Sequence, residues 1–200
     1  PLNYTHALFV RGPHTRNALL RNGVYTPPIY GDCGLLMPDL YQPCFTKKYK
    51  LGIIPHYVDY EKAKQLYGDN PQILLIDVRN PNIETTIDLI ASCEKIVSSS
   101  LHGLIISDAY NIPNKWIKFS NQIKGDNTKF YDYFLSVSRV DKTPIINFHK
   151  TLIMNTILQM INPVQIHFKK KELKEILFYN KKGITEYVKY LFLKLQKEHN

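Results

Sequence analysis

The chain has 200 residues, of which 44% are hydrophobic and 22% are charged, and its formal net charge is +9 at pH 7. This length suits one well-packed domain, alone or with part of a second, and the composition is ordinary for a globular protein. The longest apolar runs, near 73–76 and 104–106, are much too short for a transmembrane helix.

The start of the chain has no basic region followed by an apolar stretch, which excludes a signal peptide. It begins with Pro1 and reads like the middle of a protein, so we expect an upstream portion. Three cysteines, Cys33, Cys44 and Cys93, lack Cys-x-x-Cys spacing. That argues against a disulfide framework and against a zinc site, and it favours a reducing, cytoplasmic setting.

Residues 1–45 are rich in proline and glycine and short of periodic pattern, although 15–22 fits a short helix. From residue 46 short apolar runs alternate with amphipathic segments. The pattern predicts strands at 50–54, 72–78, 95–98 and 115–119 and helices at 59–67, 83–92 and 101–110. The alternation predicts an α/β fold, a Rossmann-like parallel sheet with helices on both faces. No Gly-x-Gly-x-x-Gly follows the first strand, so no dinucleotide site is predicted.

Residues 146–200 are predicted to form a helical, basic C-terminal extension. One helix is expected over 145–161, stopped by Pro163, and an apolar stripe at helical spacing follows within 184–195. From residue 168 to the end, 9 lysines face 4 glutamates. This excess suits a nucleic acid, an anionic membrane surface or a phosphorylated substrate, and a solvated lysine-rich surface explains it equally well. For the stripe, packing on the protein's own body is favoured over a membrane surface.

The stretch Ser98-Ser99-Ser100-Leu101-His102-Gly103 lies between a buried strand and a predicted helix. A helix N-terminus presents unpaired N–H groups and partial positive charge. Hydroxyls and a histidine there make a site for a phosphate or carboxylate, placed where open α/β sheets bind ligands. Simple capping of the helix is the alternative.

Four blocks in order carry a resemblance to a known family: Val-Arg-Gly-Pro-His-Thr at 10–15, Gly-Asp-Cys-Gly-Leu-Leu-Met-Pro-Asp-Leu at 31–40, Ser-Ser-Ser-Leu-His-Gly at 98–103 and Lys-Phe-Tyr-Asp-Tyr-Phe-Leu-Ser-Val-Ser-Arg at 129–139. From about 9 to 139 the chain resembles the polysaccharide pyruvyltransferases. Members have two Rossmann-like domains, as in two-domain (GT-B-like) glycosyltransferases, with the active site between them. They transfer pyruvate from phosphoenolpyruvate to a sugar as a cyclic ketal.

The resemblance implies that 1–45 are the end of an N-terminal domain and the inter-domain connection. It implies that 46–145 are the C-terminal, donor-binding domain, followed by the extension at 146–200. The expected partners are phosphoenolpyruvate and a glycan or lipid-linked acceptor of a bacterial surface polysaccharide, with a peripheral contact at the inner membrane surface compatible with the basic tail. No nucleic acid, cofactor or metal is expected.

The resemblance also implies site residues. His102 and Asp32 are predicted to be catalytic, His102 as acid or phosphate ligand and Asp32 as base or orienting group. The predicted substrate-binding residues are Arg11, Ser98, Ser100, Gly103, Lys124, Lys129 and Arg139. The family's motif often reads Ser-x-Arg-x-His-Gly, and this chain has Ser100 at the arginine position, so another cation is expected to substitute.

Ordinary structural roles are alternative explanations for several of these residues. Arg11 suits a loop arginine bonded to carbonyls, Asp32 a turn aspartate, and Lys129 with Asp132 an ordinary surface pair. His56 and Asp77 are predicted at strand ends facing the same crevice, although capping alone accounts for His56. Two other functions stay open: a glycosyltransferase that uses a nucleotide-sugar, and a non-catalytic glycan-binding module.

Overall fold

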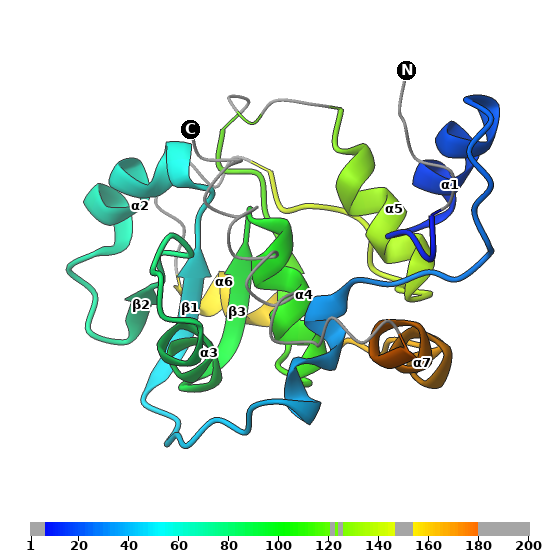
Figure 1. Cartoon of the computed structure of the whole chain (residues 1–200). Coiled ribbons are helices and arrows are strands. Elements are labelled where there is room, and N and C mark those ends of the chain that lie inside the picture. Colours follow the sequence, from blue (N-terminus) through cyan, green and yellow to red (C-terminus); the bar gives the residue numbers. More distant parts are fainter. Residues whose placement is uncertain (1–6, 121–122, 124–125, 147–153, 180–200) are drawn as a thin grey trace.

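Four short parallel strands form a single sheet at the centre of the molecule (Figure 1). The computed structural model describes residues 7–120, 123, 126–146 and 154–179. The strands are β1 Tyr49–Ile54, β2 Ile73–Leu75, β3 Cys93–Ser98 and β4 Asn114–Trp116, in the order β2-β1-β3-β4. Every neighbouring pair is parallel. The predicted α/β fold with a parallel sheet is therefore confirmed.

Helices cover both faces of this sheet because the direction in which successive strands are added to the sheet reverses after β2. The helices concerned are α2 Tyr60–Tyr67, α3 Ile83–Ala91, α4 Leu101–Ala109 and α6 Met154–Gln159. The chain moves from β1 to β2 at the edge and then returns past β1 to β3, so right-handed crossovers place α2 and α3 on opposite faces. Ile53 and Ile54, neighbours in β1, accordingly belong to two different apolar clusters, one with Ala63 of α2 and Ile157 of α6, the other with Ile90 of α3.

The boundaries of these elements follow the predictions closely. The helix expected at 59–67 begins at Tyr60, after a single 3-10 turn η2 Tyr57–Asp59. Asp59 is the N-cap residue of α2, yet its side chain makes no capping hydrogen bond. The strand expected at 72–78 is shorter, since only Ile73–Leu75 pairs with β1.

The single helix expected over 145–161 is wrong. Ile145 instead pairs with Ile117 in a parallel bridge, its N–H donating to Trp116 O at 2.9 Å, which lengthens the sheet beside β4. Within the described residues, the helical part of this range is α6. The C-terminal end of α6 is held by Lys95 of β3, whose Nζ donates to the carbonyls of Leu158 and Ile161, each at 2.8 Å. A lysine at a helix C-terminus complements the free carbonyls there. The apolar stripe predicted within 184–195 lies outside the described residues.

A second layer packs beside α4, away from the β2 edge (Figure 1). It consists of α1 Pro13–Arg21, the 3-10 helix η1 Cys33–Asp39, α5 Thr128–Ser136 and α7 Lys170–Tyr179. Residues 15–22 were predicted to be helical, whereas η1 and α5 had no prediction. Leu35 of η1 shares a buried cluster with Leu101 and Leu104 of α4. The segment expected to be an inter-domain connection is thus packed on α4.

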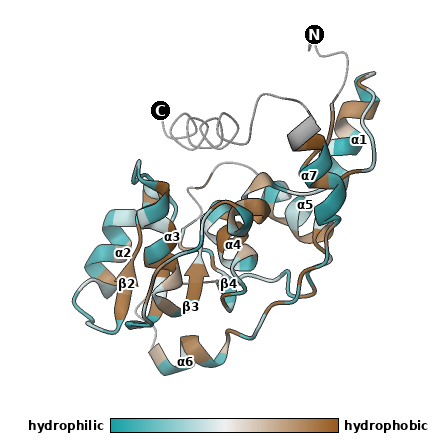
Figure 2. Cartoon of the chain, turned by 60° about the horizontal axis from the view of Figure 1, so that its bottom comes forward, coloured by the Kyte–Doolittle hydropathy of each residue, from teal (hydrophilic) through white to brown (hydrophobic). Residues whose placement is uncertain are grey.

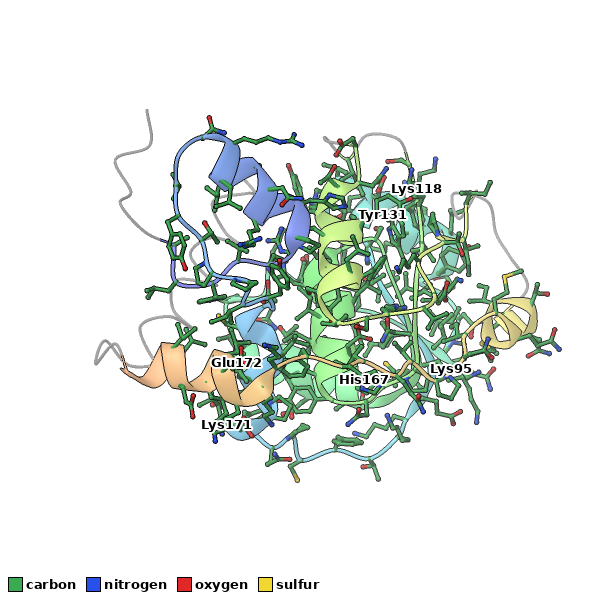
Figure 3. All side chains as sticks on the ribbon, turned by 90° about the vertical axis from the view of Figure 1, so that its right-hand side faces the viewer. Lys95, Lys118, Tyr131, His167, Lys171 and Glu172 are labelled. Carbon is green, nitrogen blue, oxygen red and sulfur yellow. The ribbon has the colours of Figure 1, made fainter. Side chains whose placement is uncertain are left out.

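The helix α7 closes this layer from the C-terminal side. In the view of Figure 3, the segment that carries His167 runs from α6 past the end of α5 to α7, where Lys171 and Glu172 are labelled. The His167 N–H donates to Val137 O at 2.8 Å. Leu173 of α7 is fully buried, and its Cδ2 lies against Gly31.

Hydropathy follows this architecture (Figure 2). The strands β2 and β3 are brown, as expected for strands enclosed by helices, while much of α2 is teal. Within the described residues, each helix is either too short or too polar to traverse a lipid bilayer.

Candidate active site

The carboxyl ends of β1 and β3 are the point where the strand order reverses. Open α/β sheets bind their ligands at such a point. Here the loop after β1 is tied to the loop after β3, because the His56 N–H donates to Ser99 Oγ at 2.8 Å and the Ser99 N–H donates to Ile54 O at 3.0 Å. His56 thus lies just after a strand end, as predicted, and its backbone helps to fix these two loops.

The serine-rich turn after β3 is held by hydrogen bonds of a buried serine side chain. Ser98 is fully buried, and its Oγ accepts the Ser100 N–H at 3.0 Å. The Ser98 hydroxyl has two carbonyls within reach for its own proton, Ser100 O at 2.7 Å and Ile54 O at 3.1 Å. Ser100 is the N-cap residue of α4, but its side chain makes no capping bond. These contacts give Ser98 a structural role in holding the turn.

Gly103 lies in the first turn of α4 and packs inward. A Cβ atom at this position would collide with Ser98 Oγ and would lie 3.0 Å from two side-chain carbons of Ile54. His102, by contrast, is half-exposed at the same helix start. The motif Ser-Ser-Ser-Leu-His-Gly thus combines a close-packed interior with one accessible imidazole, and its glycine is needed for packing.

Arg11 and Asp32 are brought together by a parallel bridge between Val10 and Tyr30. The Gly31 N–H donates to Val10 O at 3.1 Å, and Gly31 has a φ of +146°, a conformation that suits glycine. Asp32 Oδ1 accepts the Gly34 N–H at 3.0 Å, and Oδ2 lies 3.8 Å from Arg11 Nε. The side chains are 26% exposed for Arg11 and 8% for Asp32. Asp32 therefore orients the Arg11 side chain, which remains partly exposed to solvent.

The segment that follows this ion pair packs against α4. A Cβ atom on Gly34, two residues after Asp32, would be 2.8 Å from Ile105 Cγ2 and 3.5 Å from Ile106 Cδ1. Since residues three and four apart share one face of a helix, Ile105 and Ile106 lie one turn after His102 on the same face. Gly34 therefore packs on the face of α4 that carries His102, one turn along the helix from it.

The remaining predicted cations lie elsewhere. Arg139 is 1% exposed, and its guanidinium donates to Asp108, to Asn114 and to the carbonyl of Asp141. These partners give Arg139 a structural role, away from any accessible surface. Lys129, on α5, places its Nζ 5.7 Å from the centre of the Phe130 ring. Lys124 lies outside the described residues.

Two aspartates, Asp59 and Asp132, are almost fully buried. Asp59 is 2% exposed, and within the described chain its Oδ2 has no hydrogen-bond partner. Burial raises the pKa of this carboxyl, against the lowering effects of a hydrogen bond from Ser120 and of Lys62. Asp132 is 1% exposed and caps α1 from the neighbouring helix α5. This cap joins segments that are distant in the chain, so sequence spacing does not reveal it.

The opposite, amino edge of the sheet carries a separate groove of about 350 Å³. Cys44, which is exposed, lines it together with Lys48 before β1 and Ser92 before β3. Cys33 and Cys93 are buried, and burial raises the pKa of Cys93 to about 12. Among the described residues, no group of three or more histidine, cysteine or acidic side chains could hold a metal ion.

The chain is 37% identical over 122 residues to the uncharacterized protein L143 of Acanthamoeba polyphaga mimivirus, a match that covers 56% of this chain and 40% of that relative. The chain thus corresponds to less than half of the relative's length. No solved structure matches it.

The family described as polysaccharide pyruvyl transferase matches residues 2–121. The match therefore occupies the N-terminal part of this chain and includes Arg11, Asp32 and the serine-rich turn. It ends before the block at 129–139, which the resemblance had included. With more than half of its residues matched, the chain belongs to the polysaccharide pyruvyl transferase family.

Proposed function

We propose that this protein takes part in the transfer of pyruvate from phosphoenolpyruvate to a sugar of a polysaccharide or of its lipid-linked precursor. The observation that supports the proposal is that the segment with the Arg11–Asp32 pair packs, through Gly34, on the face of α4 that carries His102 at its start. It joins a cation, a group able to exchange protons at neutral pH and a helix N-terminus.

The chemistry of the donor fits these groups. Phosphoenolpyruvate carries a phosphate and a carboxylate, and a guanidinium binds either one through paired, charge-assisted hydrogen bonds. Arg11 would supply that contact, held in place by Asp32. The N–H groups at the start of α4 would face the second anionic group. These groups support phosphoenolpyruvate as the donor, although Ser100 occupies the position where the family often has arginine.

The reaction needs one acid and one base. A proton is added to the methylene carbon of the donor, which leaves a cationic centre at the neighbouring carbon. Two sugar hydroxyls bond to that carbon and the bond to phosphate breaks. Of the two hydroxyl protons, one replaces the proton given to the methyl group and the other leaves on phosphate. His102 is the residue we assign to the acid step, because it is half-exposed at the start of α4 and an imidazole can give a proton near neutral pH.

Asp32 is better suited to orient Arg11 than to act as the base. One of its oxygens accepts a backbone N–H and the other faces Arg11, and the side chain is only 8% exposed. Its predicted role is therefore narrowed in the proposal to the orienting alternative.

The test is phosphate release from phosphoenolpyruvate in the presence of lipid-linked glycan acceptors. It compares this chain, the chain extended by any upstream sequence its gene encodes, and each with His102→Ala or Arg11→Lys. Loss of a general acid lowers turnover about 10²- to 10⁴-fold. Arg11→Lys is expected to raise the KM for phosphoenolpyruvate, because lysine cannot form the paired contact.

His167→Ala is the matched control, since His167 is exposed and its hydrogen bond to Val137 uses only the backbone N–H. Acceptor-dependent release that His102→Ala abolishes and His167→Ala leaves intact supports the proposal. No release from either form, with a sugar nucleotide raising the Tm, would identify a glycosyltransferase instead. Glycan binding without any turnover would identify a binding module.

A further inference from the structure

The N-terminus of α1 is capped by a residue more than a hundred positions away. The N-cap residue, Gly12, has no side chain that could accept the free N–H groups of the first turn. Asp132 of α5 does so instead. Its Oδ1 accepts the His14 N–H at 2.7 Å, and its Oδ2 accepts the Thr15 N–H at 3.3 Å and the Thr15 hydroxyl at 2.5 Å.

Gly12 permits this contact because the backbones approach closely. A Cβ atom on Gly12 would collide with the main-chain oxygen of Asp132 and would lie 2.5 Å from its Oδ1. Gly12 has a φ of −168°, which any residue can adopt, so the requirement for glycine is one of space alone. The carboxylate also occupies the positive end of the α1 dipole, so this helix start does not serve as an anion site.

Arg11 is consequently fixed on both sides. On one side Val10 is bridged to Tyr30, and on the other Gly12 is pressed against Asp132. The backbone of Arg11 has little freedom between these two points, and its guanidinium is directed toward Asp32. The capping aspartate lies outside the family match, which ends at residue 121.

We propose that Asp132 is a positioning residue for Arg11: by capping α1 through Thr15, it holds the guanidinium where the donor's anionic group binds. The inference rests on the proposed function. It assigns to the block at 129–139 a role that differs from donor contact by Lys129. The expected signature is weakened donor binding with an unchanged chemical step, because Arg11 binds and does not transfer protons.

The sharpest test changes Thr15 and leaves the buried aspartate intact. Thr15→Val keeps the shape of the side chain and removes the hydroxyl that bonds to Asp132, whereas Thr15→Ser keeps that hydroxyl. The control is Thr128→Val, which removes another hydroxyl-to-carboxylate bond, to Asp126, at the exposed start of the same helix α5. The KM for phosphoenolpyruvate, kcat, the Kd for phosphoenolpyruvate by calorimetry and the Tm are measured for each.

Thr15→Val is expected to raise KM and Kd about fivefold with kcat nearly unchanged, since a small misplacement of a binding group weakens binding strongly. Thr15→Ser is expected to restore both constants, and Thr128→Val to leave them as in the wild type. Equal constants in Thr15→Val and wild type would overturn the inference, as would an equal effect of Thr128→Val.

The failure of the proposed function would look different. Wild-type protein that binds phosphoenolpyruvate without releasing phosphate contradicts the transfer reaction, and the ratio of Kd values then decides the role of Asp132 alone. Wild-type protein that neither binds nor converts phosphoenolpyruvate refutes both.

Discussion

Asp59 is a carboxyl group enclosed by the protein at the carboxyl edge of the sheet. The Asp59 N–H donates to His56 O at 2.9 Å, and the His56 N–H in turn donates to Ser99 Oγ. One carboxylate oxygen has no hydrogen-bond partner in the described part of the chain. An ionised group in such surroundings is poorly solvated, which is why burial raises its pKa. Groups of this kind weaken a fold and occur often in functional crevices.

Replacing Asp59 by asparagine is expected to stabilise the protein at neutral pH. The pKa of Asp59 is raised in the folded state, so the folded protein binds more protons than the unfolded chain between the two pKa values. The contribution of Asp59 to stability is therefore full below the unfolded pKa of about 3.9 and is lost as the pH rises through the folded pKa. Asp59→Asn should gain about 1 kcal/mol at pH 7.

The measurement is the Tm of both proteins from pH 4 to pH 8, with Asp69→Asn, an exposed aspartate, as control. The advantage of Asp59→Asn should shrink toward pH 4. A constant difference across this range would show that the carboxyl does not titrate as its burial requires.

Gly103 offers a second prediction for a single residue. Gly103→Ala introduces a Cβ atom against Ser98 Oγ and Ile54, and such overpacking costs about 1–3 kcal/mol. For a chain of this size the Tm should fall by about 2–4 °C for each kcal/mol. Adding Ser98→Ala removes the colliding oxygen. The double variant should therefore lose less stability than the sum of the losses in the two single variants. Strict additivity would mean that the two side chains do not meet.

Among the secondary-structure elements, α4, β4 and α5 are joined by one buried polar network. Asp108 of α4 accepts the Tyr133 hydroxyl at 2.8 Å, the Asn114 amide at 2.6 Å and Arg139 Nη1 at 3.1 Å. The side chains of Arg139 and Asp108 are 1% and 0% exposed. Burial and the adjacent Asp108 raise the pKa of Tyr133 well above its usual value, so this phenol remains a donor. Every charge in the network has a partner.

Arg139→Met should be strongly destabilising, because it leaves Asp108 buried without its cation. Breaking a buried pair in this way costs about 3–5 kcal/mol, so the Tm should fall by about 10 °C. Arg79→Met is the matched control: Arg79 pairs with Asp77 at 2.6 Å, but both side chains are substantially exposed, at 44% and 31%. Its effect should be below about 1 kcal/mol. A raised KM for phosphoenolpyruvate at an unchanged Tm would instead return Arg139 to the substrate-binding residues.

The helix α7 shows how a basic element can be part of the fold. Lys170 and Lys174 both reach Asp39 of η1, at 2.9 Å and 3.4 Å. These cations hold the pKa of Asp39 below its ordinary value, with the Lys170 hydrogen bond as the largest cause. The pairs are partly exposed and stabilise little. Leu173, buried against Gly31, contributes more, and it places α7 beside the segment that carries Asp32.

For the molecule as a whole, the sheet and its helices could be predicted because each element carries a local periodic signal. The strands β1 and β3 are apolar runs, and the helices between them have one apolar face each. Arg11, Asp32 and His102 could be named from short motifs at expected turns. The pairing of Arg11 with Asp32 needed the fold, since it depends on the bridge between Val10 and Tyr30.

What could not be predicted depends on contacts between distant segments. The helix α5 mixes aromatic and polar residues, and its buried side follows from packing on Trp116, whose ring stacks on Phe130 at 4.6 Å. The burial of Arg139 and the cap by Asp132 likewise depend on partners more than twenty residues away. Ile145 looked helical because its run is apolar, but an edge beside β4 was open to it.

The three cysteines have a practical consequence for labelling chemistry. Cys44 is exposed at the amino edge of the sheet, whereas Cys33 and Cys93 are enclosed, with Cys93 also kept protonated by its pKa of about 12. Because the thiolate is the reactive form, a maleimide dye should attach to Cys44 alone while the protein is folded. The native sequence thus carries a single addressable point for a fluorophore, at the end of the sheet opposite the His102 face.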